Sequence, residues 1–254
     1  LTPWSAASEL YRIQVLLTPP TFDNSIFTLS DGSQRSAGNV TDNPYWTKEN
    51  NPFKDETNKF VGNATLTYKL IDHLSLSYQV NGDYLFGNSE TALNRGSVYI
   101  PTGHIMNRDE KFKSLQSKFS AKFNKNWDNF SLNALAGHEY NTSKRTIERI
   151  DGYNLALPGN YNILNATDIE LYNRIFKRHS NAAFGRVNAD YRQKFILEAA
   201  MRGEWSSVSN KALLSPSVGI ATNIHEMVRS DLFQYIKLRA NISRADKETP
   251  LYMD

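Results

Sequence analysis

Residues 55–86 read DETNKFVGNATLTYKLIDHLSLSYQVNGDYLF, and this stretch decides the fold. Apolar and polar side chains alternate along residues 60–70, and the alternation resumes along residues 74–84. A period of two is the period of a β-strand whose two faces differ in polarity. Only residues 71–73 separate the two segments, so the stretch predicts an antiparallel hairpin with a very short turn.

The same alternation returns along the rest of the chain. Further strands are predicted at residues 115–123, 130–139, 183–191 and 195–205, with weaker candidates at 216–222, 235–244 and 9–17. Short links at residues 71–73, at 124–129 and around Gln193 alternate with long polar segments at 18–58, 87–109 and 143–173. Short turns on one side of a sheet and long loops on the other are typical of outer-membrane β-barrels, with the turns in the periplasm and the loops outside.

The two faces of these strands differ in a way that favours a membrane over a soluble core. One face carries Gly, Ala, Leu and Phe, with Tyr and Trp toward the strand ends, where the aromatic girdles of membrane barrels lie. The other face carries charges, among them Asp83, Arg186, Glu198 and Arg202. A water-filled lumen tolerates such charges, whereas a packed core does not. The fold class predicted is therefore all-β, an antiparallel transmembrane β-barrel.

NPYWTKENNP at residues 43–52, followed by the hairpin quoted above, resembles the barrel of SusC/RagA-like TonB-linked outer-membrane transporters. Asn58-Lys59-Phe60 stands where that family usually has Asn-Arg-Phe, and His73 stands where Trp is common. The resemblance continues in TPPTFDN at residues 18–24, in the turn around Gly103 and in NADYRQKFILEAAMRGEWSS at residues 188–207. These motifs identify the family but are silent about the substrate.

The resemblance implies an active transporter that imports oligosaccharides or peptides across the outer membrane of a Gram-negative cell. Its partners would be a SusD-like surface lipoprotein, TonB through a segment absent here, and outer-membrane lipid. Residues 1–254 would then be one partial barrel domain, without the plug domain and without either end of a barrel of roughly 22 strands. The inward charges named above would line the lumen or hold the plug.

Composition and motifs exclude several other classes. The chain has 29 Lys and Arg against 26 Asp and Glu, spread along its length, so no nucleic-acid partner is expected. It has no Cys, its five His lie on separate segments, and it lacks HExxH, GxSxG, P-loop and GxGxxG motifs. We therefore expect no catalytic residue, no metal, no cofactor and no enzymatic activity.

Aromatic residues in the long loops are the candidate ligand-binding residues, because rings stack on the apolar faces of sugars and pack against peptide side chains. These candidates are Tyr45, Trp46, Tyr99, Tyr153 and Tyr161. A loop-packing role is the alternative for each of them. Two alternatives to the transporter also stay open: a small autonomous porin or adhesin-like barrel, and a soluble carbohydrate-binding β-domain whose charged face is simply the solvent side of its sheet.

Overall fold

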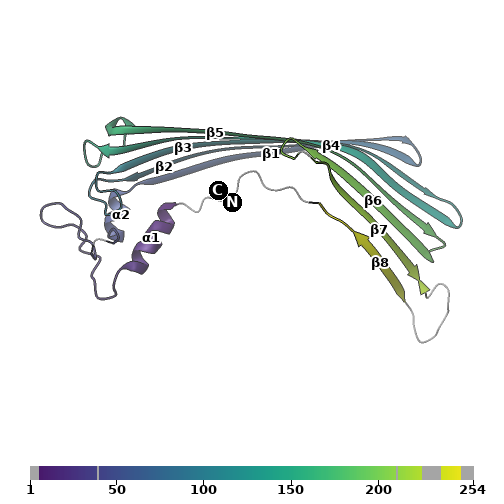
Figure 1. Ribbon diagram of the computed structural model, residues 1–254, viewed down its shortest axis with the longest axis horizontal. Helices are drawn as coiled ribbons and strands as arrows, with labels where there is room; N and C mark the ends of the chain where they lie inside the picture. Colours follow the sequence, from purple (N-terminus) through teal and green to yellow (C-terminus); the bar gives the residue numbers. More distant parts are fainter. Residues whose placement is uncertain (1–5, 39, 210, 225–235, 247–254) are drawn as a thin grey trace. The chain divides into compact units, whose positions relative to one another are not determined.

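The computed structural model describes residues 6–38, 40–209, 211–224 and 236–246, and this part of the chain is dominated by one sheet (Figure 1). Eight strands lie side by side in chain order, β1-β2-β3-β4-β5-β6-β7-β8. Their bounds are Phe53–Ile71 (β1), Leu74–Leu93 (β2), His104–Asn126 (β3), Phe130–Leu155 (β4), Ala166–Tyr191 (β5), Phe195–Ser206 (β6), Leu213–Asn223 (β7) and Lys237–Ser243 (β8). The all-β prediction is confirmed.

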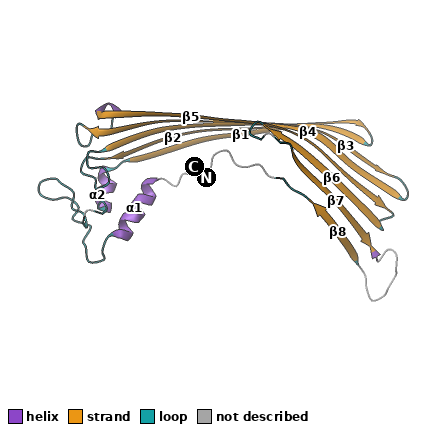
Figure 2. Cartoon of the chain, in the orientation of Figure 1, coloured by secondary structure: helices purple, strands orange, loops and turns teal. Residues whose placement is uncertain are grey.

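Helical structure in the described residues is confined to the segments outside the strands (Figure 2). In the described residues, helix α1 lies at Ala6–Leu17, helix α2 at Pro44–Asn50 and the 3₁₀ turn η1 at Ile163–Asn165. Within this part of the chain, neither helix has the length and hydropathy needed to cross a bilayer.

The register of β5, β6, β7 and β8 confirms the two faces read from the sequence. These strands pair antiparallel, and Val187 faces Ala199, which in turn faces Val218, which faces Ile242. One residue further along each strand, the row contains Asn188, Glu198, Gly219 and Asn241. Apolar and polar rows therefore alternate across four strands, as they must when every side chain in a row shares one face of the sheet.

The apolar face is exposed rather than packed. Leu197, Val218 and Ile220 are each half exposed or more, at 51%, 50% and 57%. A soluble sheet of this size would bury such side chains against a second layer. A single-layer sheet that keeps them outside is the arrangement of a barrel wall facing lipid.

The chain divides into two compact units. The loop unit comprises residues 1–60, 84–112 and 145–176, and the turn unit comprises residues 61–83, 113–144 and 177–254. The loop unit has a small apolar core of Ala92, Ile105 and Leu155, against which Tyr161 and Ile163 pack. In the turn unit, Ala182 is the buried apolar residue among those described, which again fits a wall rather than a core.

The predicted short links are confirmed as tight turns. Residues 72–73 join β1 to β2, residues 127–129 join β3 to β4, and residues 192–194 join β5 to β6. Arg192 and Gln193 have φ angles of 53° and 58°, the left-handed pair that a tight hairpin requires. The Asp190 carboxylate accepts a hydrogen bond of 2.7 Å from the backbone N–H of Gln193, which helps to hold these non-glycine residues in that conformation.

The strand predicted at residues 9–17 is wrong, because these residues belong to helix α1. The apolar residues Leu10, Ile13 and Leu17 are spaced by three and four, which is a helical spacing, and two alanines open the segment. The short run of alternation at its centre was too brief to outweigh that pattern. The strand predicted at 235–244 is confirmed within residues 237–243, and its first residue lies outside the described residues.

The predicted bounds of the long loops are also wrong. Strand β2 continues to Leu93, β3 begins at His104, β4 continues to Leu155 and β5 begins at Ala166. The predicted loops at 87–109 and 143–173 therefore shrink to residues 94–103 and 156–165. The extension of β4 carries polar side chains on both faces, for example RTIER at residues 145–149, so it loses the alternation by which strands are recognised. The first part of β5 does alternate, with Ile169, Leu171 and Ile175 against polar neighbours, and the predicted loop at 143–173 missed this pattern.

Candidate functional site

The loop unit is organised around the DNPYW segment at residues 42–46. The Asn43 side chain caps helix α2 by accepting a hydrogen bond of 2.9 Å from the backbone N–H of Tyr45, and Pro44 occupies the first helical turn, where its missing N–H costs nothing. The Asn43 amide also donates to the carbonyls of Asn24 and Arg35. One asparagine thus starts the helix and ties it to the preceding loop.

Asp42 is a second anchor of this segment. Its fully buried carboxylate accepts hydrogen bonds from Gln34 Nε2 at 2.9 Å, Ser97 Oγ at 2.7 Å and the backbone N–H of Val98 at 2.6 Å. These donors come from two separate loops, residues 18–41 and 94–103. Hydrogen bonds to a buried charge are among the strongest in proteins, so Asp42 fixes the two loops against each other.

The end of helix α2 is tied to the third loop, residues 156–165. The Tyr161 hydroxyl donates a hydrogen bond of 2.6 Å to the Asn50 carbonyl. Asn94 accepts from the backbone N–H of Gly159 at 2.8 Å and donates through its own N–H to Asn51 Oδ1 at 2.9 Å. Three loops and α2 therefore form one hydrogen-bonded assembly.

Four of the predicted aromatics lie in or beside this assembly, with different exposures. Trp46 is buried, 4% exposed, and packs close to Gly96. Tyr45 is 47% exposed, and its ring stacks on Phe27 with centroids 6.4 Å apart. Tyr99 is 39% exposed, and its hydroxyl lies 2.9 Å from Thr41 Oγ1. Tyr45 and Tyr99 thus keep ring surface available to a solute, whereas Trp46 does not.

Tyr161 and Tyr153 are partly buried. Burial raises the pKa of Tyr161, whose ring packs on the small core of the loop unit. The ring of Tyr153 stacks on His104 with centroids 4.6 Å apart. His104 Nε2 lies 3.0 Å from Asp151 Oδ1, and Arg149 pairs with Asp151 Oδ2 at 2.6 Å. Sequence alone gave no signal for this cluster, because its members are separated by most of β3 and β4 and by the turn at residues 127–129.

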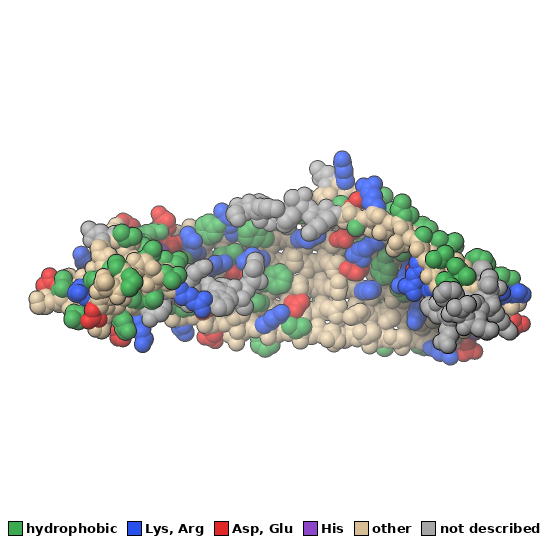
Figure 3. Space-filling model, turned by 90° about the horizontal axis from the view of Figure 1, so that it is seen from below, with side chains coloured by type: hydrophobic (Ala, Val, Ile, Leu, Met, Phe, Trp, Pro, Cys, Tyr) green, Lys and Arg blue, Asp and Glu red, His purple; other side chains and the backbone are tan. Residues whose placement is uncertain are grey.

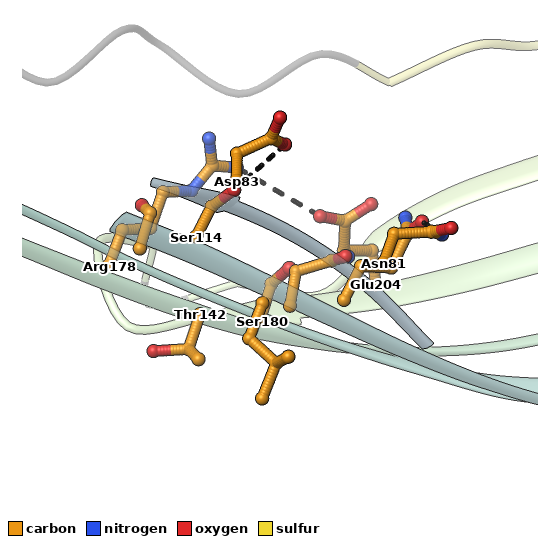
Figure 4. Close-up of a pocket in the computed structure, with 11 residues that line it drawn as sticks. Asn81, Asp83, Ser114, Thr142, Arg178, Ser180 and Glu204 are labelled. Carbon is orange, nitrogen blue, oxygen red and sulfur yellow. Dashed lines mark hydrogen bonds and ion pairs between the residues drawn. The ribbon is translucent and has the colours of Figure 1, made fainter. Parts of the chain in front are cut away.

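The turn unit contains a polar pocket of about 320 Å³ on the charged face of β2, β3, β4, β5 and β6 (Figure 4). Asp83 and Arg178 point to the same side of the strands, and Thr142 points to the other. Ser114 Oγ donates to Asp83 Oδ2 at 3.3 Å, and Arg178 lies 3.9 Å from Glu204 Oε1. The remaining lining residues are Asn81, Leu115, Gln116, Asn141, Ser143 and Ser180.

A hydrogen-bonded network runs across the strands beside this pocket. Asn81 donates to Gln116 at 2.7 Å, and Gln116 donates to Glu139 at 3.1 Å. Arg202 donates to Glu139 at 3.4 Å and to Glu204 at 3.2 Å. The network joins β2, β3, β4 and β6, and Figure 3 shows acidic and basic side chains together over one face of the molecule.

Of the four charged residues predicted to face the lumen, two lie in the polar pocket or in the network beside it. Asp83 lines the pocket and Arg202 belongs to the network, whereas Arg186 and Glu198 are absent from the pocket lining. Asn141 and Ser143 continue the odd-numbered polar row of Glu139, so a longer reading of that alternation would have found them. The pocket offers amide, hydroxyl and charged groups, which suit hydrogen bonding to a peptide or a sugar. Within residues 6–38, 40–209, 211–224 and 236–246, no group of three or more metal-ligating side chains is present.

Comparison with known proteins shows which family shares this arrangement of strands. Residues 8–245 match the family described as TonB dependent receptor-like, beta-barrel. The structure of the RagAB peptide transporter superposes with a TM-score of 0.71 at 16% sequence identity, over 85% of this chain and 25% of that one. The RagAB peptide importer in its open-open state gives a TM-score of 0.67 at 19% identity, over 85% and 24%.

This chain therefore spans about a quarter of the length of the solved structures that it matches. No curated protein matches it. At these identities the solved structures establish the shared fold, and the family match extends over nearly the whole chain. The chain belongs to the β-barrel family of TonB-dependent receptor-like proteins, which are outer-membrane proteins.

Proposed function

We propose that this chain is part of an outer-membrane active transporter that imports peptides or oligosaccharides and draws its energy through TonB. The observation that carries the proposal is the two-faced sheet, with exposed apolar side chains on one face and a hydrogen-bonded polar pocket on the other. A wall of this kind separates lipid from a wet lumen. The family is one of receptors and transporters rather than enzymes.

Peptides are the first substrate class to test, because the solved structures with this fold are described as a peptide transporter and a peptide importer. A SusD-like surface lipoprotein is the partner that we propose. Residues 1–254 are, in this proposal, one partial barrel domain of a longer chain, since the matched structures are about four times as long. Tyr45 and Tyr99, with exposed rings in the loop unit, are the proposed solute contacts.

Extraction of the intact protein from native outer membranes in detergent tests the proposal. Mass spectrometry of the purified protein should detect a bound peptide or oligosaccharide and a lipoprotein that copurifies. Cells that contain the protein should take up the labelled solute, and removal of TonB should abolish uptake. Uptake that continues without TonB would overturn the proposal, as would a purified protein with neither solute nor lipoprotein.

Two substitutions test the proposed contacts. Tyr45→Ala and Tyr99→Ala should each weaken solute binding by about fivefold to tenfold, since an aromatic stacking contact is worth about 1 kcal/mol. Leu157→Ala is the matched control, because Leu157 lies in a neighbouring loop, is 61% exposed, and has an apolar side chain with no aromatic ring. Equal affinities in all three variants would remove these tyrosines from the site.

A further inference from the structure

The apolar face of the turn unit has a groove at the end where the short turns lie. Its volume is about 200 Å³. It is lined by Phe130 of β4, Ala189 and Tyr191 of β5, Phe195, Ile196 and Leu197 of β6, and Ile220 of β7. Tyr191 pairs with Phe195, and Ala189 pairs with Leu197, so the smallest side chain of the groove lies in the row next to two aromatic rings.

The walls of the groove are open to the outside. Tyr191, Phe195 and Leu197 are each about half exposed, at 46%, 49% and 51%. On a barrel wall this surface faces hydrocarbon, and the aromatic rings beside the turns mark the boundary between hydrocarbon and headgroups. Part of a flexible hydrocarbon chain suits a groove of this chemistry, because every residue that lines it has an apolar or aromatic side chain.

Two cations lie at the turn end of the groove, each beside an aromatic ring. The Arg192 guanidinium lies 5.4 Å from the centroid of the Tyr191 ring, and its Nε donates to Asn129 Oδ1 at 3.1 Å. Lys125 Nζ lies 5.1 Å from the centroid of the Trp127 ring, which packs 5.6 Å from the ring of Phe130. Both cations are thus fixed through rings that line or adjoin the groove.

The acidic residues of the same turns do not cancel these cations at the groove. Asp190 accepts a hydrogen bond from the backbone N–H of Gln193, and its place in the alternation puts it on the polar face. Asp128, in the turn at residues 127–129, is one carboxylate against the two cations Arg192 and Lys125. The turn end of the apolar face therefore carries a net positive charge.

We propose that this groove binds one anionic phospholipid, with an acyl chain between Tyr191, Phe195 and Leu197 and the phosphate beside Arg192 and Lys125. The assignment rests on charge complementarity, because an apolar groove that ends at two cations matches a molecule with a hydrocarbon tail and an anionic head. The inference rests on the membrane location in the proposed function, and it concerns a site on the opposite face from the polar pocket of the turn unit.

The test uses the intact protein in a mild detergent, with phosphatidylglycerol and phosphatidylcholine of identical acyl chains as probes. Native mass spectrometry should show one phosphatidylglycerol retained at higher occupancy than phosphatidylcholine. Arg192→Gln combined with Lys125→Gln should reduce phosphatidylglycerol affinity by about 25-fold, since each cation near an anionic lipid surface contributes roughly fivefold. Lys211→Gln is the control, because Lys211 lies in the loop at the other end of β6.

Ala189→Phe tests the hydrocarbon part, because the larger side chain should fill the groove and reduce binding of both lipids. Only variants with heat-modifiable mobility on electrophoresis, a sign of a folded barrel, are compared. Equal retention of the two lipids by the unaltered protein would overturn the proposal, as would unchanged phosphatidylglycerol binding in the double variant. Solute uptake should be normal in all of these variants, so failure of the lipid site and failure of the transport function give different results.

Discussion

At the scale of single residues, Asp42 shows why the DNPYW segment is built as it is. Its buried carboxylate accepts three hydrogen bonds from two loops. Removing the carboxylate leaves buried donors without an acceptor, at a cost of about 1–3 kcal/mol for each group. Water and loop rearrangement can satisfy some of these donors, and the loops then lose their fixed arrangement.

We therefore predict that Asp42→Ala loosens the loop at residues 94–103. Hydrogen exchange of the Val98 amide, measured by mass spectrometry on the intact protein, should accelerate by at least tenfold. Asp31→Ala is the control, because Asp31 is exposed and its hydrogen bonds go to Ser33 alone. If both variants exchange at the original rate, Asp42 is not the anchor described here.

Gly103 is a second residue whose identity is fixed by geometry. Its φ is +82°, and a Cβ at this position would lie 2.7 Å from Leu155 Cδ1 and 3.2 Å from the backbone nitrogen of Arg95. Leu155 belongs to the small core of the loop unit, so it has little room to move. An added methyl group would meet both an unfavourable backbone conformation and a close contact.

We predict that Gly103→Ala destabilises the loop unit by about 2–4 kcal/mol, the sum of left-handed strain and overpacking. Gly159→Ala separates the two causes, because Gly159 has a φ of +70° and nothing within 4 Å of its added Cβ. It should cost about 1–2 kcal/mol. Hydrogen exchange of Ile105 and Leu155 reports the difference, and equal protection in both variants would contradict the overpacking argument.

At the scale of the element, β6 places two adjacent alanines on opposite faces. Ala199 faces Val187 and Val218 in the apolar row, and Ala200 faces Arg186 and Ser217 in the polar row. The two positions share one strand and one residue type, so they differ only in the environment that the pleat gives them. They form a matched pair for testing which face meets lipid.

Ala199→Lys should impair folding into the membrane, because a lysine on the lipid face near the bilayer centre costs about 2–4 kcal/mol. Ala200→Lys should fold almost as well as the unaltered protein, since its side chain would lie in the wet lumen. The folded fraction in lipid vesicles, measured by heat-modifiable mobility, checks the pair. The reverse order of the two variants would mean that the faces are assigned the wrong way round.

At the scale of the whole molecule, the described sheet has two edge strands, β1 and β8. Each edge leaves a row of backbone N–H and C=O groups without a strand beside it. In lipid every such group must be satisfied, at a cost of several kcal/mol for each one that is not. The proposed longer chain would supply the strands that pair with both edges.

We predict that the isolated 254-residue chain does not form a folded, monomeric barrel in lipid vesicles. It should aggregate or associate through β1 and β8, and its electrophoretic mobility should not change on heating. The intact protein, treated in the same way, should show the shift. A monomeric, heat-modifiable product from residues 1–254 alone would overturn the partial-barrel proposal and favour a small autonomous barrel.

The sequence by itself determined the strands, their two faces and the family, because a two-residue period is a local property that survives without tertiary context. Residues 60–84 are the clearest case, since alternation and a tight turn lie within one stretch. The sequence misassigned residues 9–17, where a brief alternation competed with helical spacing. It also shortened β1, β2, β3, β4 and β5. The outer part of β4 is polar on both faces and carries no period to detect, whereas the outer part of β5 alternates at residues 168–175 and was missed.

Only the tertiary structure decided which side chains meet. Trp46 and Tyr45 are neighbours in the sequence, yet one is buried and the other is half exposed, because helix α2 turns one side toward the loops and the other away. Hydrogen bonds link Asn81 to Gln116, Glu139 and Arg202, which lie on four different strands. Likewise, Arg192 in one turn donates to Asn129 in another. Such contacts depend on strand register, which a repeating pattern of two leaves open by any even number of residues.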